Sequence, residues 1–181
     1  FPSLKRIVFI GHSAGGQFIQ RYAVGTNINQ EVFPEVVFVP SNPSSYLYLN
    51  KERYQFKNND FKRISDPGKN CDEYNHYIYG LINRPKYYYK TSYEYKIKKF
   101  LSKDVTYLMG EEDNLTDYLD RSCEANLQGK DRFQRSLNFY YYLKKEYSTH
   151  NHKFLSVPGV GHDHDLIFNS KEFKEVLFSP K

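Results

Sequence analysis

Four short apolar runs along the chain predict buried strands, at residues 6–10, 35–39, 105–109 and 153–157. Each run is rich in β-branched or aromatic residues and is followed by residues that favour turns. The apolar positions are continuous rather than alternating, which is typical of strands covered on both faces of a parallel sheet.

Residues with helical periodicity separate these runs. One such pattern follows the first run and ends near Gly25, and another follows Asp131, a residue type that favours the start of a helix. A last helix is predicted from about Ser170, with Phe173 facing the core and Pro180 ending it. Strands that alternate with helices predict the α/β class, with a mostly parallel sheet and helices on both faces.

The stretch at about 44–102 interrupts this alternation. It is polar, rich in tyrosine and punctuated by proline and glycine, and it is too long for a simple connection between two strands. We interpret it as a lid or cap inserted into a single domain over residues 1–181, with a helix at about 93–101.

The composition limits the class of protein. The 181 residues include 14 Phe and 18 Tyr, a content of aromatic rings that excludes a disordered chain. The length suits one domain. No apolar run approaches the roughly 20 residues that cross a bilayer, so no membrane span is predicted.

The net charge and the two cysteines give weaker indications, the first about binding partners and the second about a disulfide. The net charge is +5, but the lysines are scattered among tyrosine and asparagine without a recognition motif, so we predict no nucleic-acid partner. Cys71 and Cys123 fit either one disulfide or two separate thiols. A disulfide would tie the inserted segment to the rest of the domain and would favour a secreted protein.

The segment Gly11-His12-Ser13-Ala14-Gly15 follows the first predicted strand and opens the first predicted helix. A G-x-S-x-G pattern in this context is typical of a nucleophile elbow, although a tight turn around a small serine is the alternative. The turn requires a strained backbone at Ser13, and we expect glycine on both sides because larger side chains would collide. It also aims the N–H of Ala14 from the start of a helix, where an oxyanion is favoured.

Two further candidates follow the third and fourth predicted strands. Asp113 comes after the third and His162 after the fourth, so both lie, like Ser13, past the carboxyl end of a strand, where open α/β sheets bind ligands. We predict that Ser13 is the nucleophile, His162 the general base and then acid, and Asp113 the carboxylate that orients it. The alternative carboxylates for the last role are Glu111, Glu112 and Asp117.

The remaining histidines near these motifs have simpler interpretations. His12 is expected to pack beside the elbow rather than to react. The run His162-Asp163-His164-Asp165 does not converge easily in an extended loop, so we predict no metal, and no motif indicates a cofactor.

These motifs resemble the α/β-hydrolase superfamily, in which the chain order is also Ser, Asp, His. Longer strings at residues 11–23, 41–48 and 122–129 resemble a poorly characterised group within it. The resemblance covers nearly the whole chain. It implies a serine hydrolase acting on a small-molecule acyl substrate, an ester or a related compound, and it implies that Asn42 and Tyr46 lie at the substrate pocket.

One departure from the superfamily is large. Its nucleophile follows the fifth strand, whereas Ser13 follows the first predicted strand, so the chain resembles the C-terminal part of a hydrolase. The loop that supplies a second oxyanion N–H would then be missing, and the loss of one such donor costs about 10²–10³ in rate. We therefore expect weak or no activity from this chain by itself. The alternatives are an inactive fragment and a non-catalytic binding protein on the same scaffold.

Overall fold

The computed structural model describes residues 3–28 and 34–178. Its central sheet has the strand order β1-β2-β5-β6, and all neighbouring strands are parallel. The strands are β1 (Arg6–His12), β2 (Glu35–Ser41), β5 (Asp104–Gly110) and β6 (His152–Val157). Each contains one predicted apolar run and is longer than it by one or two residues, so the strand predictions are confirmed.

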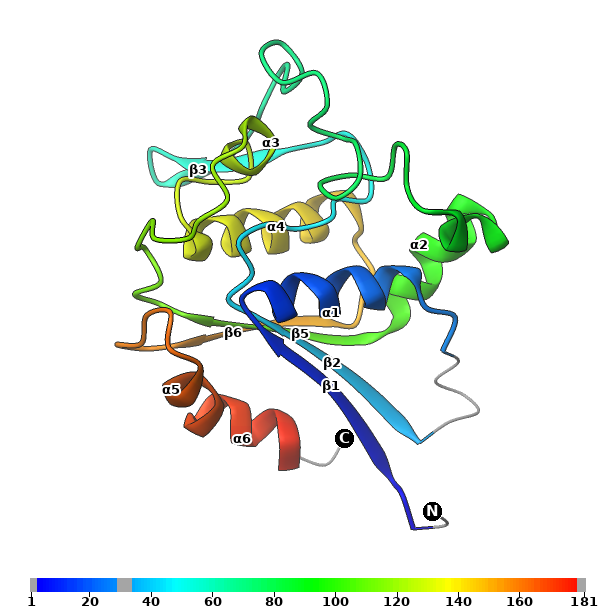
Figure 1. The fold of residues 1–181 in the computed structure, drawn as a ribbon, viewed down its shortest axis with the longest axis vertical. Helices are drawn as coiled ribbons and strands as arrows, with labels where there is room; N and C mark the ends of the chain where they lie inside the picture. The colour runs from blue at the N-terminus through cyan, green and yellow to red at the C-terminus, as the bar shows by residue number, and fades with distance from the viewer. Residues whose placement is uncertain (1–2, 29–33, 179–181) are drawn as a thin grey trace.

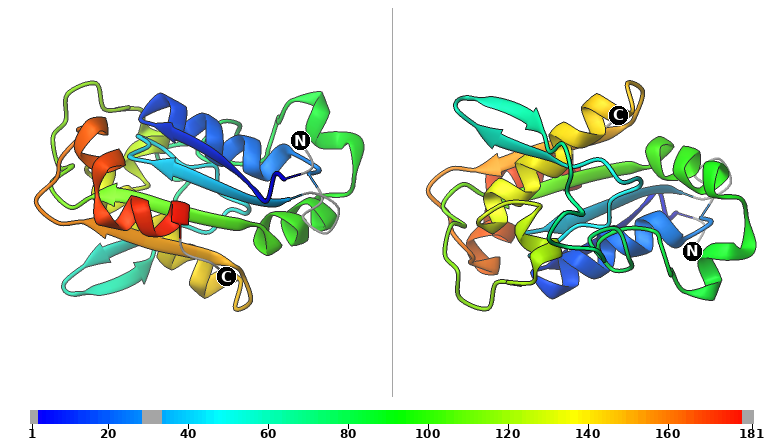
Figure 2. Two further views of the ribbon diagram at one scale, coloured as in Figure 1. Left: turned by 90° about the horizontal axis from the view of Figure 1, so that it is seen from below. Right: turned by 90° about the horizontal axis from the view of Figure 1, so that it is seen from above.

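Helices cover both faces of the sheet, as predicted (Figures 1 and 2). One face carries α1 (Ala14–Gly25), α2 (Tyr93–Ser102) and α4 (Arg132–Glu146), and the other carries α5 (His164–Asn169) and α6 (Lys171–Phe178). The side chain of Asp131 caps α4 by accepting a hydrogen bond from the N–H of Gln134. The sequence pattern missed α5, and Pro180 lies outside the described residues.

The core has one part on each face of the sheet. The larger part lies beneath α1 and α4 and is strongly aromatic, which accounts for much of the tyrosine in the composition. Its members include Tyr46, Tyr48, Tyr107, Phe139 and Tyr142. The smaller part packs against α5 and α6 and is mostly aliphatic, with Val37, Val39, Leu108, Ile167 and Phe173.

The segment 44–102 is partly core and partly surface. Its first residues enter the aromatic core, where the side chains at 46–49 are fully buried. The strands β3 (Tyr54–Lys57) and β4 (Asp60–Arg63) then form an antiparallel hairpin, followed by the 3-10 helix η1 (Lys86–Lys90) and by α2. The helix near 93–101 is therefore confirmed, the hairpin was not predicted, and the function of the outer part as a lid stays a prediction.

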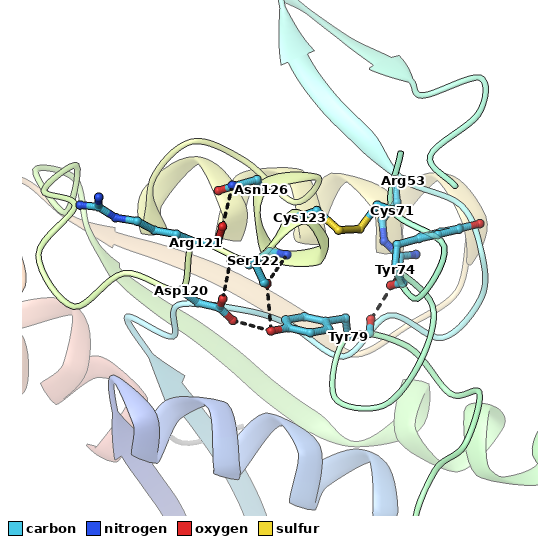
Figure 3. The surroundings of a disulfide bond; sticks show 10 residues. Arg53, Cys71, Tyr74, Tyr79, Asp120, Arg121, Ser122, Cys123 and Asn126 are labelled. Carbon is cyan, nitrogen blue, oxygen red and sulfur yellow. Dashed lines mark hydrogen bonds between the residues drawn. A yellow bond between two sulfur atoms is a disulfide. The ribbon is translucent and has the colours of Figure 1, made fainter. Parts of the chain in front are cut away.

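A disulfide between Cys71 and Cys123 fastens this segment to α3 (Cys123–Asn126), with Cα atoms 5.8 Å apart (Figure 3). Hydrogen bonds reinforce the junction, because the hydroxyl of Tyr79 donates to Asp120 Oδ2 over 2.7 Å. Ser122 Oγ in turn donates to the Tyr79 hydroxyl over 3.0 Å. Of the two options that the sequence left open, the structure contains the disulfide.

Across the described ranges, every helix is too short or too polar to pass through a bilayer.

Candidate active site

Ser13 lies at the sharp turn between β1 and α1, with φ of 56° and ψ of −118°. Its N–H donates to the carbonyl of Ser41 at the end of β2, over 2.9 Å, which fixes the turn against the sheet. A Cβ on Gly11 would collide with the carbonyl of Gly15, so glycine is required at that flank.

The other required glycine is not the expected one. A Cβ on Gly15 would meet open space, so the expectation of a collision there is wrong. A Cβ on Gly16 would instead collide with the carbonyl oxygen of Ser41, because the first turn of α1 packs directly on the end of β2. The need for a small residue therefore comes from the neighbouring strand and not from the elbow alone.

Three side chains meet at the carboxyl ends of the strands. Ser13 Oγ lies 3.0 Å from His162 Nε2, and His162 Nδ1 lies 2.8 Å from Asp113 Oδ2. The His162 side chain is 25% exposed, whereas that of Asp113 is fully buried. A hydroxyl, an imidazole and a carboxylate thus form one line from the surface inward, although 149 residues separate the serine from the histidine.

The carboxylate of Asp113 is held from several directions. Asn42 Nδ2 donates to Asp113 Oδ2 over 2.6 Å and also faces the carbonyl of Gly161 at 3.3 Å. The other carboxylate oxygen, Oδ1, makes no hydrogen bond, and its neighbouring charge is Arg132 Nη1 at 3.6 Å. Asp113 is therefore the carboxylate that contacts His162, while Glu111 accepts a hydrogen bond from Ser156.

Neither residue expected to line a pocket offers its side chain to one, because Asn42 and Tyr46 are both 0% exposed. Asn42 belongs to the surroundings of Asp113. Tyr46 stacks on Phe139 with ring centroids 4.6 Å apart, and its hydroxyl donates to Met109 Sδ over 3.6 Å. The expectation for Tyr46 is therefore corrected: the chain turns into the core directly after β2, and the ring belongs to that core.

His12 packs against the imidazole of His162, with ring centroids 4.5 Å apart. Its Nε2 atom is buried and has no hydrogen-bond partner. Burial, followed by the proximity of His162, lowers the pKa of His12 to about 4. At neutral pH the ring is uncharged, which fits the packing interpretation made from the sequence.

Ala14 is the first residue of α1, so its N–H belongs to the group of helix N–H donors that have no intrahelical acceptor. The positive end of the helix dipole lies at the same place. A negatively charged oxygen beside Ser13 would be stabilised by this N–H and by the positive end of the helix dipole.

The residues Asp163, His164 and Asp165 have ligand atoms within 4.8 Å of one another, and all three are exposed. Asp163 already caps α5 by accepting from the N–H of Leu166 over 3.0 Å. His162 is turned away from this group toward Ser13. Cys71 and Cys123 are bonded to each other, so they offer no thiolate to a metal.

Arg132, which is buried beside Asp113, was not predicted from the sequence. The residue stands at the first position of α4, where nothing in the local pattern distinguishes it from a surface arginine. Only the packing of the α4 N-terminus against the loop after β5 brings the two charges together.

No family model matches the chain, and no curated protein matches it. Among solved structures, the chain is similar to the poly(3-hydroxybutyrate) depolymerase LpqC from Bordetella parapertussis, with a TM-score of 0.61, 22% identity and coverage of 88% of this chain and 45% of that one. It is also similar to poly(aspartic acid) hydrolase-1 from Sphingomonas sp. KT-1, with a TM-score of 0.59, 26% identity and coverage of 84% and 48%. The chain thus spans less than half the length of either neighbour. The fold is of the α/β-hydrolase type.

Proposed function

We propose that the chain carries the catalytic residues of a serine hydrolase that cleaves esters or related acyl compounds through an acyl-enzyme. The observation that carries this proposal is the pair of distances from His162 to its neighbours, 3.0 Å to Ser13 Oγ and 2.8 Å to Asp113 Oδ2. A serine hydroxyl is a weak nucleophile at neutral pH and requires a base within hydrogen-bond reach. An imidazole whose far nitrogen faces a buried carboxylate meets that requirement.

In the first half of the reaction, Ser13 Oγ attacks the acyl carbonyl carbon while His162 Nε2 accepts the hydroxyl proton. The Nδ1–H of His162 donates to Asp113, which holds the ring in the tautomer that leaves Nε2 free and stabilises the imidazolium that forms. The carbonyl oxygen becomes an oxyanion, and the N–H of Ala14 donates to it. When the tetrahedral intermediate collapses, His162 gives its proton to the leaving group.

In the second half, a water molecule replaces the leaving group. His162 takes a proton from this water as it attacks the acyl carbonyl carbon, and the same tetrahedral geometry returns. The bond to Ser13 Oγ then breaks, and the serine recovers its proton from His162. The partial exposure of His162 supports this step, because water has access to the imidazole.

The substrate class is narrowed by what the two structural neighbours are named for. One is a depolymerase of a polyester and the other a hydrolase of a poly(amino acid), so both are named for attack on an acyl group. We take an ester as the first substrate to test, because an alcohol is an easier leaving group than an amine.

The experiment is covalent labelling of the protein with a fluorophosphonate probe, with Ser13→Ala as the control. We expect labelling of the unsubstituted protein at Ser13 and none of the variant. Turnover of a short-chain aryl ester should be weak in this chain by itself and absent from the variant. Labelling that persists in Ser13→Ala, or a folded parent that is not labelled at all, would contradict the proposal.

A further inference from the structure

Arg132 is a buried cation at the closed end of the candidate site. It is 1% exposed, and its Nη1 atom lies 3.6 Å from Asp113 Oδ1. In the part of the chain that the structure describes, Asp113 is the carboxylate with which Arg132 forms an ion pair. The line of groups that begins at Ser13 therefore ends in a positive charge.

The same arginine holds the loop that carries Asp113. Its Nη2 donates to the carbonyl of Asp117 over 2.9 Å and its Nη1 to that of Leu115 over 3.3 Å. The next residue of α4 also holds this loop, because the N–H of Phe133 donates to the carbonyl of Asp113 over 3.2 Å. The first turn of α4 thus positions the carboxylate as well as facing it with a charge.

Arg135, one turn further along α4, offers a matched comparison. It is 0% exposed and donates to the carbonyls of Gly129 and Ser44 and to Asn126 Oδ1. These partners are neutral, and none belongs to the line from Ser13 to Asp113. Two buried arginines on one helix therefore differ in whether they face the carboxylate of the site.

We propose that Arg132 is a positioning residue that, through Asp113, sets the pH range in which His162 is free to act as a base. An unopposed carboxylate would stabilise the imidazolium strongly and keep the ring protonated to higher pH. The guanidinium beside Asp113 offsets part of that negative charge, so its removal should stabilise the imidazolium further. The consequence for catalysis rests on the proposed function; the effect on the titration of His162 does not.

Other groups also face His162 and act on its titration. His12 from β1 packs on the ring, and the His164 ring lies 5.9 Å from that of His12. The exposed carboxylates next to the site in the sequence are Asp163, which follows His162, and Glu112, which precedes Asp113. None of these groups changes when Arg132 is replaced, so the effect of the guanidinium can be isolated by substitution.

The experiment is an NMR titration of the imidazole C2 protons, with the His162 signal assigned through its loss in His162→Gln. In Arg132→Gln the titration midpoint of His162 should rise by about one pH unit, since one unit charge is removed a few ångströms beyond the carboxylate. Arg132→Lys, which keeps the charge, and Arg135→Gln, the matched control, should leave the midpoint unchanged. The acid limb of kcat/KM should move with the midpoint.

A purely structural role would lower the stability of the variants without moving the midpoint. An unchanged midpoint in Arg132→Gln, or an equal shift in Arg132→Lys, would overturn the proposal. If Arg132→Gln does not fold, Arg132→Met is a second neutral variant, and the titration of Arg132→Lys still decides between charge and shape. Failure of the proposed hydrolase function would look different, because Ser13 would then resist the fluorophosphonate while His162 titrated as expected.

Discussion

One histidine lies at the start of β6 and another in the loop that follows the strand, and their surroundings are very different. His152, the first residue of the strand, is 4% exposed, with Nε2 lying 2.9 Å from the carbonyl of Phe100 and Nδ1 lying 3.1 Å from the hydroxyl of Tyr107. His162, in the loop after the strand, contacts Asp113 and Ser13 and keeps a quarter of its side chain exposed. Burial lowers the pKa of His152 to about 3.

This difference follows from the construction of a parallel sheet. The amino end of β6 lies beside α2 and the aromatic core, so a histidine there packs as an uncharged ring among other rings. At the carboxyl ends the chain leaves each strand in a loop, and side chains from several loops can meet at the surface. The residue type is therefore less informative about function than the end of the strand at which it stands.

The largest test of this comparison replaces each histidine in turn. His162→Gln should lower kcat by roughly 10⁴-fold with little loss of stability, because the proposed base is removed from a partly exposed position. His152→Gln should destabilise the protein yet keep its turnover under conditions in which it remains folded. Ester hydrolysis and thermal unfolding of the same preparations measure both effects. Comparable losses of turnover in the two folded variants would remove the distinction between the ends.

Removal of the disulfide tests how the 44–102 segment is fastened to the part of the molecule beyond the carboxyl ends of the sheet strands. The bond closes a loop of 52 residues, so Cys71→Ser with Cys123→Ser should lower the free energy of unfolding by about 3–4 kcal/mol in the chain-entropy model. Urea denaturation with and without reductant checks this value. We expect Ser13 labelling to persist in the folded variant, since His162 is held by Asp113 and Ser13 and not by the disulfide. Equal stability of parent and variant would show that the segment is held by its core residues alone.

The dependence of stability on acid pH tests the histidine at the amino end of β6, His152. The pKa of His152 is about 3 in the folded protein because of burial, and about 6.5 when the chain is unfolded, so the unfolded state binds the extra proton as the pH falls below about 6.5. The contribution of His152 to stability is complete above that pH and should shrink by roughly 2–3 kcal/mol by about pH 4.5. His12, with a pKa lowered to about 4 by burial, acts in the same direction.

Denaturant titrations of the parent and of His152→Gln at several pH values measure this dependence. The variant should lose a large part of the slope below about pH 6.5. An identical slope in both proteins would mean that His152 is protonated as easily in the folded as in the unfolded chain.

The smallest expected effect concerns the helix that carries Arg132. Asp131→Ala removes the N-cap of α4 and should cost about 1 kcal/mol of stability. Ser92→Ala, which removes the exposed cap of α2, is the matched control and should cost less. Unfolding curves compare the two. A larger cost at Ser92 would argue that the α4 N-terminus is held by Arg132 and its loop rather than by its cap.

The sequence pattern supported the fold better than the surroundings of the site. Continuous apolar runs and helical periodicity located the four sheet strands and the helices α1, α2, α4 and α6, because burial on a strand or helix face leaves a local trace. The hairpin of β3 and β4 left no such trace, since most of its residues are exposed or half-buried. Tyr46 was misplaced because its position at the pocket was only implied by the family resemblance, and the residue type could not correct it, since a tyrosine suits a pocket wall and a core equally well.

What the sequence determined by itself is the alternation of strands and helices along the chain, and the positions of Ser13, Asp113 and His162 just past strand ends, because each depends on residues close together in the chain. The tertiary structure decided what surrounds them. Arg132 beside Asp113, the amide of Asn42 against the same carboxylate, and the need for glycine at position 16 all arise where separate elements pack together. Such contacts depend on the three-dimensional placement of segments distant in the chain, and local patterns carry no record of that placement.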